Sequence, residues 1–242
     1  MNRLVVHRGD MSTYPENSML AFQAAIELGF TYVELDIQLS RDRVPIVIHD
    51  DNLKRTTGID KNVRDLAADE INAIYLNSST QSENRNELLK INTFKQVVEK
   101  LSVYSKITVF VEIKRQSIEH FGLSQVVDQV LDAQMGAKFN IVIISFVGEV
   151  IEYIKSVQSY PTGFVLEKYN KKYLLKAKEL QPDYLFCNIK KINKPSDLWD
   201  GLWRWVLYDI TNPSFAYELL EQGVDLIETG DIKKLSTSEY FQ

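Results

Sequence analysis

Charged residues stand inside the most apolar stretches of this 242-residue chain. Glu34 and Asp36 are flanked by Val, Leu and Ile, and Glu112 and Lys114 repeat the same alternation further along. Because successive side chains of a strand point to opposite faces, each pair lies on one face. A buried charge is costly unless it is paired or bound to a metal, so these positions predict a functional site.

The residue types indicate which chemistry this site would perform. Glu34, Asp36 and Glu112 supply hard oxygen ligands, which suit Mg²⁺, Ca²⁺ or Mn²⁺ rather than zinc. Arg8 and Lys114 beside such an ion would form an anion site, and phosphate is the common anion that needs so much positive charge. Glu112 and Lys114 could alternatively form a structural ion pair and nothing more.

Two of the three histidines, His7 and His49, directly follow predicted strands, and their side chains can act as general acid and general base near neutral pH. We therefore expect metal-assisted phosphodiester cleavage, with the assignment of acid and base left open. The nucleophile is either water or a neighbouring hydroxyl of the substrate. Asp50 is a candidate to orient a neighbour, Asp51 fits a turn, and His120 fits a solvated position.

Nine short apolar runs, rich in Val, Ile, Phe and Tyr, predict strands along the whole chain. Several lack alternation, which is typical of strands buried on both faces. The runs are Leu4–Val6, Tyr32–Ile37, Pro45–Ile48, Ile107–Ile113, Ile141–Phe146, Gly163–Leu166, Tyr184–Phe186, Trp205–Tyr208 and Leu226–Ile227. Apolar residues at helical spacing lie between many of them, at Ala21–Leu28, Phe94–Leu101, Val147–Ile154 and Ala216–Leu220.

This alternation predicts an α/β fold, with a (β/α)8 TIM barrel as the nearest architecture and a doubly wound open sheet as the alternative. A barrel needs eight strands, so one of the nine is spare. The segment between the second and third runs is too short for a helix, and Gln38–Arg43 is expected to be an extended or turn connection. In a barrel, the carboxyl ends of the strands surround one mouth, where the charged residues would meet.

The chain is expected to form a single catalytic barrel domain over residues 1–242, with a small insertion at 57–89 after the third strand. The insertion has a weak helical pattern at Leu66–Ile74 and a polar tract at Asn77–Asn86 that we expect to be mobile.

The net charge of −5 argues against a nucleic-acid partner. No apolar run reaches the ~20 residues of a membrane helix, so we expect no membrane insertion. The apolar stretch at the N-terminus is too short for a secretory signal peptide. If the chain begins at its native start, this predicts a cytoplasmic location.

An ordered series of motifs, densest in the first quarter, resembles the glycerophosphodiester phosphodiesterase family. The motifs are His7-Arg8-Gly9, Pro15–Ser18, Ala21-Phe22, Glu34-Leu35-Asp36, Asp42, His49-Asp50, Arg55–Thr57, Ile91–Phe94, Val111–Lys114, Ser145-Phe146 and Gly223–Asp225. The resemblance implies a (β/α) barrel, a divalent cation (Mg²⁺ or Ca²⁺, or Mn²⁺), and hydrolysis of small glycerophosphodiesters to glycerol 3-phosphate and an alcohol.

The matching positions carry the family's roles onto this chain. They imply an acid/base pair, three metal ligands and two phosphate contacts: His7 and His49; Glu34, Asp36 and Glu112; and Arg8 and Lys114. Glu16 is expected near the site. Phe146 and Tyr208 are the aromatic residues expected to bind substrate.

The chain departs from the family pattern near its C-terminus. The family's Trp-Thr-Val-Asn run, whose Trp helps to form the substrate pocket, is replaced by Tyr208–Thr211, which brings Asp209 close to an anionic ligand. The family's Thr-Asp after the last strand is here Thr229-Gly230-Asp231. Because the histidines and ligands are complete, these departures concern the substrate more than the activity.

Three alternatives stay open at this point. The first is a related barrel phosphodiesterase that acts on lysophospholipids or phosphoinositides, with an apolar rim supplied in part by Phe146, Phe164, Trp203 and Trp205. The second is another metal-dependent barrel enzyme, such as an isomerase or lyase. The third is a catalytically silent barrel that binds phosphorylated ligands, although such a binder has no need of the full acid/base set.

Overall fold

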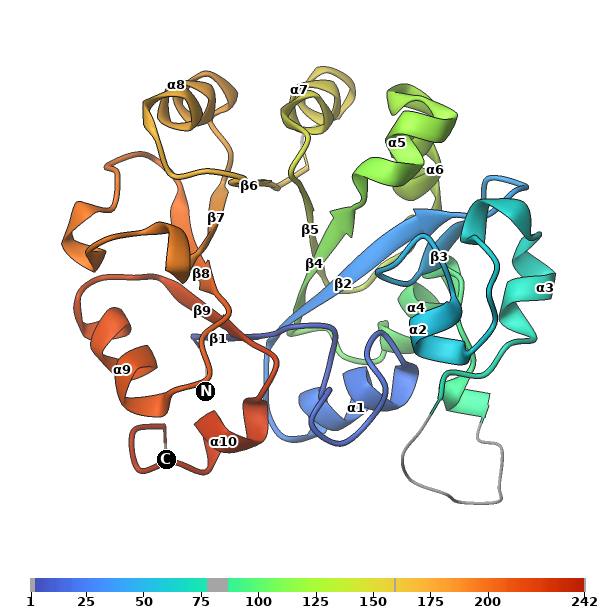
Figure 1. The fold of residues 1–242 in the computed structure, drawn as a ribbon, viewed down its shortest axis with the longest axis horizontal. Coiled ribbons are helices and arrows are strands. Elements are labelled where there is room, and N and C mark those ends of the chain that lie inside the picture. Colours follow the sequence, from blue (N-terminus) through green and yellow to red (C-terminus); the bar gives the residue numbers. More distant parts are fainter. Residues whose placement is uncertain (1–2, 78–86, 159, 242) are drawn as a thin grey trace.

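Eight parallel strands close into a barrel in the computed structural model, which describes residues 3–77, 87–158 and 160–241 (Figure 1). The barrel strands are β1 (Leu4–Val6), β2 (Tyr32–Leu39), β4 (Thr108–Ile113), β5 (Asn140–Ser145), β6 (Thr162–Val165), β7 (Tyr184–Asn188), β8 (Arg204–Tyr208) and β9 (Leu226–Thr229). Strand β1 pairs with both β9 and β2, which closes the circle. The TIM barrel predicted from the sequence is confirmed, and the alternative of an open sheet is wrong.

The spare strand is β3 (Pro45–Val47), which pairs antiparallel with the carboxyl-terminal residues of β2. The two strands form a hairpin because the turn at Ser40–Val44 is too short for a helical crossover. The predicted absence of a helix here is confirmed. However, β2 runs on to Leu39, so the connection is shorter than Gln38–Arg43, and Gln38 belongs to the strand.

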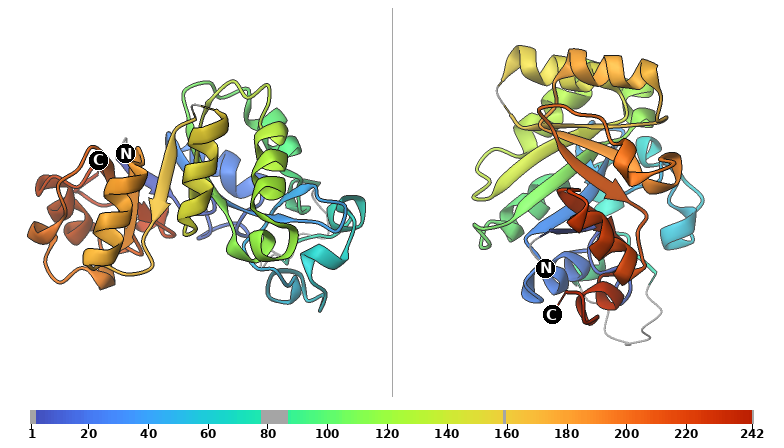
Figure 2. Two further views of the ribbon diagram at one scale, coloured as in Figure 1. Left: turned by 90° about the horizontal axis from the view of Figure 1, so that it is seen from above. Right: turned by 90° about the vertical axis from the view of Figure 1, so that its left-hand side faces the viewer.

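The helices lie around the outside of the strands (Figures 1 and 2). They are α1 (Met19–Glu27), α2 (Lys54–Thr57), α3 (Ala68–Asn72), α4 (Phe94–Leu101), α5 (Arg115–Phe121), α6 (Leu123–Ala133), α7 (Gly148–Val157), α8 (Lys171–Leu180), α9 (Pro213–Glu221) and α10 (Ile232–Ser236). Thr93 and Gln96 form the capping box that the sequence indicates at the start of α4. Within the described ranges, no helix has both the length and the apolar character needed to cross a membrane.

The inward faces of β4 and β9 change from apolar to polar toward the carboxyl end. Phe110 of β4 packs edge-on against Phe186 of β7, with ring centroids 5.2 Å apart, and the two rings help fill the lower barrel. Glu112 follows Phe110 two positions later, so it stands on the same face and nearer the mouth. Glu228 follows Leu226 of β9 in the same way. The period of two therefore places charged groups on top of an apolar plug.

The insertion after β3 has its own small apolar cluster, separate from the main core. Ile46 and Ile48 from the hairpin pack there with Val63, Leu66 and Ile71. The helical pattern predicted at Leu66–Ile74 is realised as α3. The polar tract predicted to be mobile falls almost entirely on residues 78–86, outside the described residues.

Candidate active site

A cavity of about 200 Å³ opens at the carboxyl ends of the strands. Eight of the nine predicted site residues line it: His7, Arg8, Glu34, His49, Glu112, Lys114, Phe146 and Tyr208. The ninth, Asp36, is fully buried against Arg8 and Lys114. The structure thus brings together residues that are more than 200 positions apart, as the barrel predicts.

A tight turn after β1 aims Arg8 into the cavity. Arg8 has a φ of 55° and Gly9 a φ of 81°, so both occupy the left-handed region. A Cβ atom on Gly9 would lie 2.6 Å from the Cβ of Ala21, which explains why glycine stands here. The Arg8 backbone N–H donates to the Glu34 side chain at 3.2 Å, and this bond ties β1 to β2.

Asp36 is surrounded by donors. It lies 3.0 Å from Arg8 Nε and 2.7 Å from Lys114 Nζ, and it accepts a hydrogen bond from Asn17 Nδ2 at 2.9 Å. Burial alone would raise the pKa of Asp36, but Lys114 and Arg8 hold it well below its usual value. Lys114 also lies 2.6 Å from Glu112, so the predicted ion pair exists and includes Asp36 as well.

Glu228 of β9 is a fourth carboxylate of the site, and it was not among the predicted residues. It is 5 % exposed, and its Oε1 lies 3.6 Å from His7 Nε2, while Glu34 Oε2 lies 3.9 Å from the same atom. Burial and the charges of Glu112 and Asp36 raise the pKa of Glu228 to about 8. The signal that revealed Glu34 was also present here, because Glu228 is a carboxylate in an apolar strand, but the predicted strand ended at Ile227.

We expect the pH dependence of folding stability to report Glu228. A carboxyl group whose pKa is raised in the folded state stabilises the fold below its unfolded pKa, and that contribution is lost as the pH rises toward the folded pKa. In metal-free protein, the free energy of unfolding should therefore fall between pH 4.5 and about 8. Glu228→Gln should reduce that fall by on the order of 1–3 kcal/mol.

Urea denaturation across this pH range measures the effect, with Glu99→Gln on the exposed face of α4 as the control. If Glu228→Gln and wild type lose stability in parallel, the carboxyl group of Glu228 is not the one that titrates.

His49 is oriented by a chain of charged groups. Its Nδ1 lies 2.6 Å from Asp50, which also accepts from Arg55 Nε at 2.6 Å. Arg55 donates two hydrogen bonds of 2.7 Å to Glu16, and Arg8 donates to Glu16 at 3.1 Å. The prediction that Asp50 orients a neighbour is confirmed, and Glu16 lies near the site as expected.

Both histidines are neutral at pH 7 in the free protein. Burial, followed by the positive charge of Arg8, lowers the pKa of His7 to about 4. Burial also lowers the pKa of His49 from its usual value of 6.5, against the opposing field of Asp36. The third histidine, His120, is exposed near the end of α5, in agreement with the solvated position expected from the sequence.

The aromatic residues divide into two groups. Phe146 and Tyr208 line the cavity as predicted, with Lys191 Nζ 6.0 Å and 5.9 Å from their ring centroids. Trp203 and Trp205 lie at the start of β8, at the opposite end from the mouth, and pack against each other. Their predicted contribution to an apolar rim is therefore wrong.

The extra charge of Asp209 is met by its surroundings. Asn188 Nδ2 donates to Asp209 at 2.6 Å, and Lys190 Nζ lies 3.9 Å away. The departure from the family pattern at this position is thus accommodated by side chains at and just after the end of β7.

The donor set fits a divalent cation. Carboxylate oxygens of Glu34, Asp36 and Glu112 lie within 4.8 Å of one another, and Glu34 also belongs to a second such group with His7 and Glu228. Glu34 is 2 % exposed, and its Oε1 has no hydrogen-bond partner among the described residues. Buried carboxyl groups thus outnumber the two cationic side chains, Arg8 and Lys114, and a divalent cation would favour their ionised form.

Comparisons with curated proteins give partial alignments. A protein of Bacillus subtilis (strain 168) named uncharacterized protein YqiK is 33% identical over 125 residues, which cover 52% of this chain and 50% of the relative. A glycerophosphodiester phosphodiesterase of Bacillus altitudinis is 30% identical over 132 residues, covering 54% and 53%. The chain thus spans about half the length of these relatives.

Solved structures match over nearly the whole fold. A phosphodiesterase of Oleispira antarctica, in complex with the product sn-glycerol-3-phosphate, superposes with a TM-score of 0.86 at 20% identity and covers 98% of this chain and 96% of its own. The glycerophosphodiester phosphodiesterase of Thermotoga maritima gives a TM-score of 0.74 at 23% identity, covering 96% of both chains. These likenesses establish the fold. The sequence pattern of the Glycerophosphoryl diester phosphodiesterase family matches residues 7–234, and the chain therefore belongs to this family.

Proposed function

We propose that the protein is a metal-dependent hydrolase of glycerophosphodiesters, which it splits into glycerol 3-phosphate and an alcohol. The observation that carries this proposal is one cavity lined by both histidines, Arg8 and Lys114, with the oxygens of Glu34, Asp36 and Glu112 clustered at or just behind its wall. Membership of the family supports it, as does the name of the relative from Bacillus altitudinis.

Glu34, Asp36 and Glu112 would hold the divalent cation, Mg²⁺, Ca²⁺ or Mn²⁺. When bound, the ion supplies positive charge that neutralises the phosphate and the charge developing on it. Arg8 and Lys114 would supply further positive charge to the phosphate. Both are held in place by Asp36, so their charges are already oriented before the substrate binds.

His49 is the general base in this proposal, and His7 is the general acid. Because Nδ1 of His49 faces Asp50, the proton resides there and Nε2 is left to accept one from the nucleophile. His7 donates a proton to the leaving alkoxide. An anionic phosphodiester in the cavity favours its protonated form, since an opposite charge nearby raises the pKa of an imidazole.

The pH profile tests the role of His49. A general base acts in its neutral form, so kcat/KM should fall as the pH drops through a pKa below 6.5. The Asp50 hydrogen bond raises the pKa of His49, so Asp50→Asn should move this limb to lower pH. Its plateau rate should also fall, though less than on removal of the histidine. If the acidic fall of kcat/KM occurs at the same pH in Asp50→Asn and wild type, a group other than His49 causes it.

A substrate panel tests the activity itself. We expect glycerophosphocholine and glycerophosphoglycerol to be hydrolysed with added Mg²⁺, Ca²⁺ or Mn²⁺, and glycerol 3-phosphate to appear as product. A silent phospho-ligand binder would bind these compounds without turnover, and an isomerase or lyase would leave the phosphodiester bond intact. Either result would overturn the proposal.

A further inference from the structure

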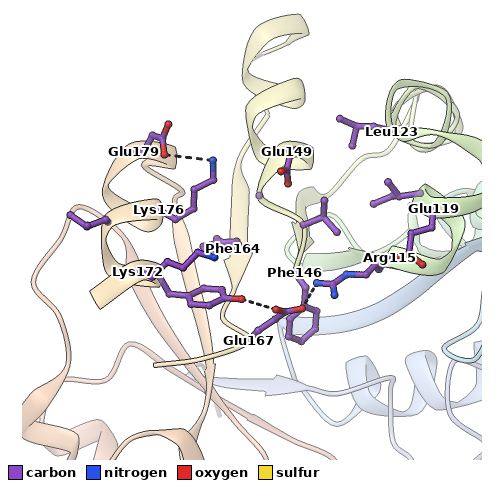
Figure 3. Close-up of a pocket in the computed structure, with 15 residues that line it drawn as sticks. Arg115, Glu119, Leu123, Phe146, Glu149, Phe164, Glu167, Lys172, Lys176 and Glu179 are labelled. Atoms are coloured by element: carbon purple, nitrogen blue, oxygen red, sulfur yellow. Dashed lines mark hydrogen bonds and ion pairs between the residues drawn. The ribbon is translucent and has the colours of Figure 1, made fainter. Parts of the chain in front are cut away.

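Two arginine side chains near the barrel mouth have different kinds of partners. Arg115 of α5 donates to Glu167, which follows β6, so this pair joins two segments beside the mouth (Figure 3). Arg55 of α2 donates instead to Asp50 and Glu16. Each of these two carboxylates in turn contacts a side chain of the active site. Arg55 therefore stands between two parts of the catalytic machinery.

The first contact of Arg55 leads to the general base. Arg55 Nε donates to one oxygen of Asp50 at 2.6 Å, and the other oxygen of Asp50 lies 2.6 Å from His49 Nδ1. Burial alone would raise the pKa of Asp50, but its bonds to Arg55 and His49 hold that pKa below its usual value. An ionised carboxylate shared in this way fixes the imidazole ring, while Arg55 takes up part of the negative charge.

The second contact leads to the phosphate-binding side chain. The two terminal nitrogens of Arg55 donate to the two oxygens of Glu16 at 2.7 Å, and Arg8 Nη1 donates to Glu16 at 3.1 Å. Glu16 is held on the barrel side, because the N–H of the next residue, Asn17, donates to the Arg8 carbonyl at 2.9 Å. Arg55 neutralises Glu16, so Glu16 can orient Arg8 without adding a net negative charge that would repel a phosphate.

A hollow lies between the loop after β1 and the insertion. It has a volume of about 400 Å³ and is lined by residues 11–16 on one side and by Asn77 on the other. Asn77 donates its N–H to the carbonyl of Thr56, the neighbour of Arg55. Leu53, just before α2, is fully buried in the insertion's apolar cluster. Arg55 thus reaches from a well-anchored helix to Glu16 beside a hollow, where the spacing of the two loops depends on its hydrogen bonds.

We propose that Arg55 is a positioning residue whose single guanidinium group holds both His49 and Arg8 in their working orientations. The inference rests on the proposed function and adds to it a residue that acts through Asp50 and Glu16. Three donors in one rigid plane serve both carboxylates at once. A lysine ammonium keeps the charge but lacks this fork, so it cannot replace Arg55.

Steady-state kinetics of Arg55 variants test the positioning role. Arg55→Gln should lower kcat/KM for glycerophosphocholine by roughly 10–100-fold, the cost of a small displacement of reacting groups. Arg55→Lys should also stay below wild type. The control is Lys54→Gln, because Lys54 is the preceding residue of α2, is 68% exposed and pairs with Asp60. A wild-type rate in either Arg55 variant, or an equal loss in Lys54→Gln, would overturn the proposal.

The pKa of His49 gives a readout that a purely structural role would not move. In Arg55→Gln the carboxylate of Asp50 faces His49 alone and a nearby positive charge is lost, so the pKa of His49 should rise. Asp50→Asn should move it in the opposite direction. Arg55→Lys keeps the charge, so the pKa of His49 should stay close to that of wild type.

NMR titration of the imidazole protons at saturating Mg²⁺ measures this pKa, with the His49 signal assigned from His49→Ala. Three further charged groups act on His49 and remain in all these Arg55 and Asp50 variants: Asp36, Lys114 and Arg8. An unchanged or lowered pKa of His49 in Arg55→Gln would show that Arg55 does not act on the base through Asp50, which would contradict the proposal.

Binding of inorganic phosphate tests the contact through Glu16. In Arg55→Gln the uncompensated charge of Glu16 competes with phosphate for Arg8, so the affinity measured by calorimetry at saturating Mg²⁺ should fall. In a Glu16→Gln background the same Arg55 substitution should change the phosphate affinity much less, because the carboxylate that it neutralises is gone. Equal losses of affinity in both backgrounds would remove Glu16 from the proposed connection.

The two readouts that need no turnover separate this inference from the function on which it rests. If wild type hydrolyses no diester but Arg55→Gln still raises the pKa of His49 and weakens phosphate binding, the proposed function fails and the positioning by Arg55 stands. If wild type hydrolyses glycerophosphodiesters and Arg55→Gln changes neither rate, pKa nor phosphate affinity, the proposed function stands and the role of Arg55 is removed.

Discussion

We expect alanine at His7 or His49 to lower kcat/KM for glycerophosphodiesters by about 10²–10⁴-fold, the usual contribution of a proton-transfer group. The two side chains line one cavity with the phosphate contacts, and each is proposed to move one proton of the same reaction. Because they act as a unit, the double variant should lose little more than the poorer single variant.

His120→Ala is the matched control for this experiment. His120 is exposed on α5 and lines none of the cavities that hold His7 and His49, so its loss should leave kcat/KM unchanged. Steady-state assays with saturating cation make the comparison. Wild-type rates for His7→Ala and His49→Ala would contradict the acid/base assignment, whatever the substrate.

Chelation of divalent cations should abolish activity, and added Mg²⁺, Ca²⁺ or Mn²⁺ should restore it. Glu34→Gln should weaken cation binding by at least about 100-fold, the upper end of what loss of a supporting contact costs at a metal site. The reason is that Glu34 belongs to both groups of ligand atoms and has a buried oxygen without a hydrogen-bond partner among the described residues.

Calorimetry and thermal melting measure the binding independently of turnover. A bound ion stabilises the folded state, so added cation should raise the Tm of wild type. The increase in Tm should be much smaller for Glu34→Gln. Glu99→Gln, on the exposed face of α4, should respond like wild type. Full activity in EDTA, or equal cation affinity in Glu34→Gln and wild type, would remove the proposed cation site.

The barrel and most of the cavity could be predicted because both depend on how side chains repeat along single strands and helices. Alternation along β2 and β4 placed Glu34 and Glu112 on the inward face, and the closed barrel brought them together. The same rule explains the error at β8. Trp205 stands three positions before Tyr208, so the two side chains point to opposite faces and lie toward opposite ends of the strand.

The remaining features depend on contacts between distant segments. The hydrogen bonds from Arg55 to Glu16 join the segment after β3 to the loop after β1, and no local pattern encodes that meeting. Glu228 differs, because its position in an apolar strand was a sufficient signal.

The hairpin of β2 and β3 gives the protein two modules with separate apolar cores. His7 and the carboxylates stand on or directly after barrel strands. His49 follows β3, and Ile46 of β3 and the adjacent Ile48 pack in the insertion's own cluster. Local unfolding can open one cooperative unit and leave another closed. Transient melting of the smaller module would withdraw one partner of the proton-transfer pair while the ion-binding carboxylates kept their places. Such excursions would make turnover more sensitive to heat than cation affinity is.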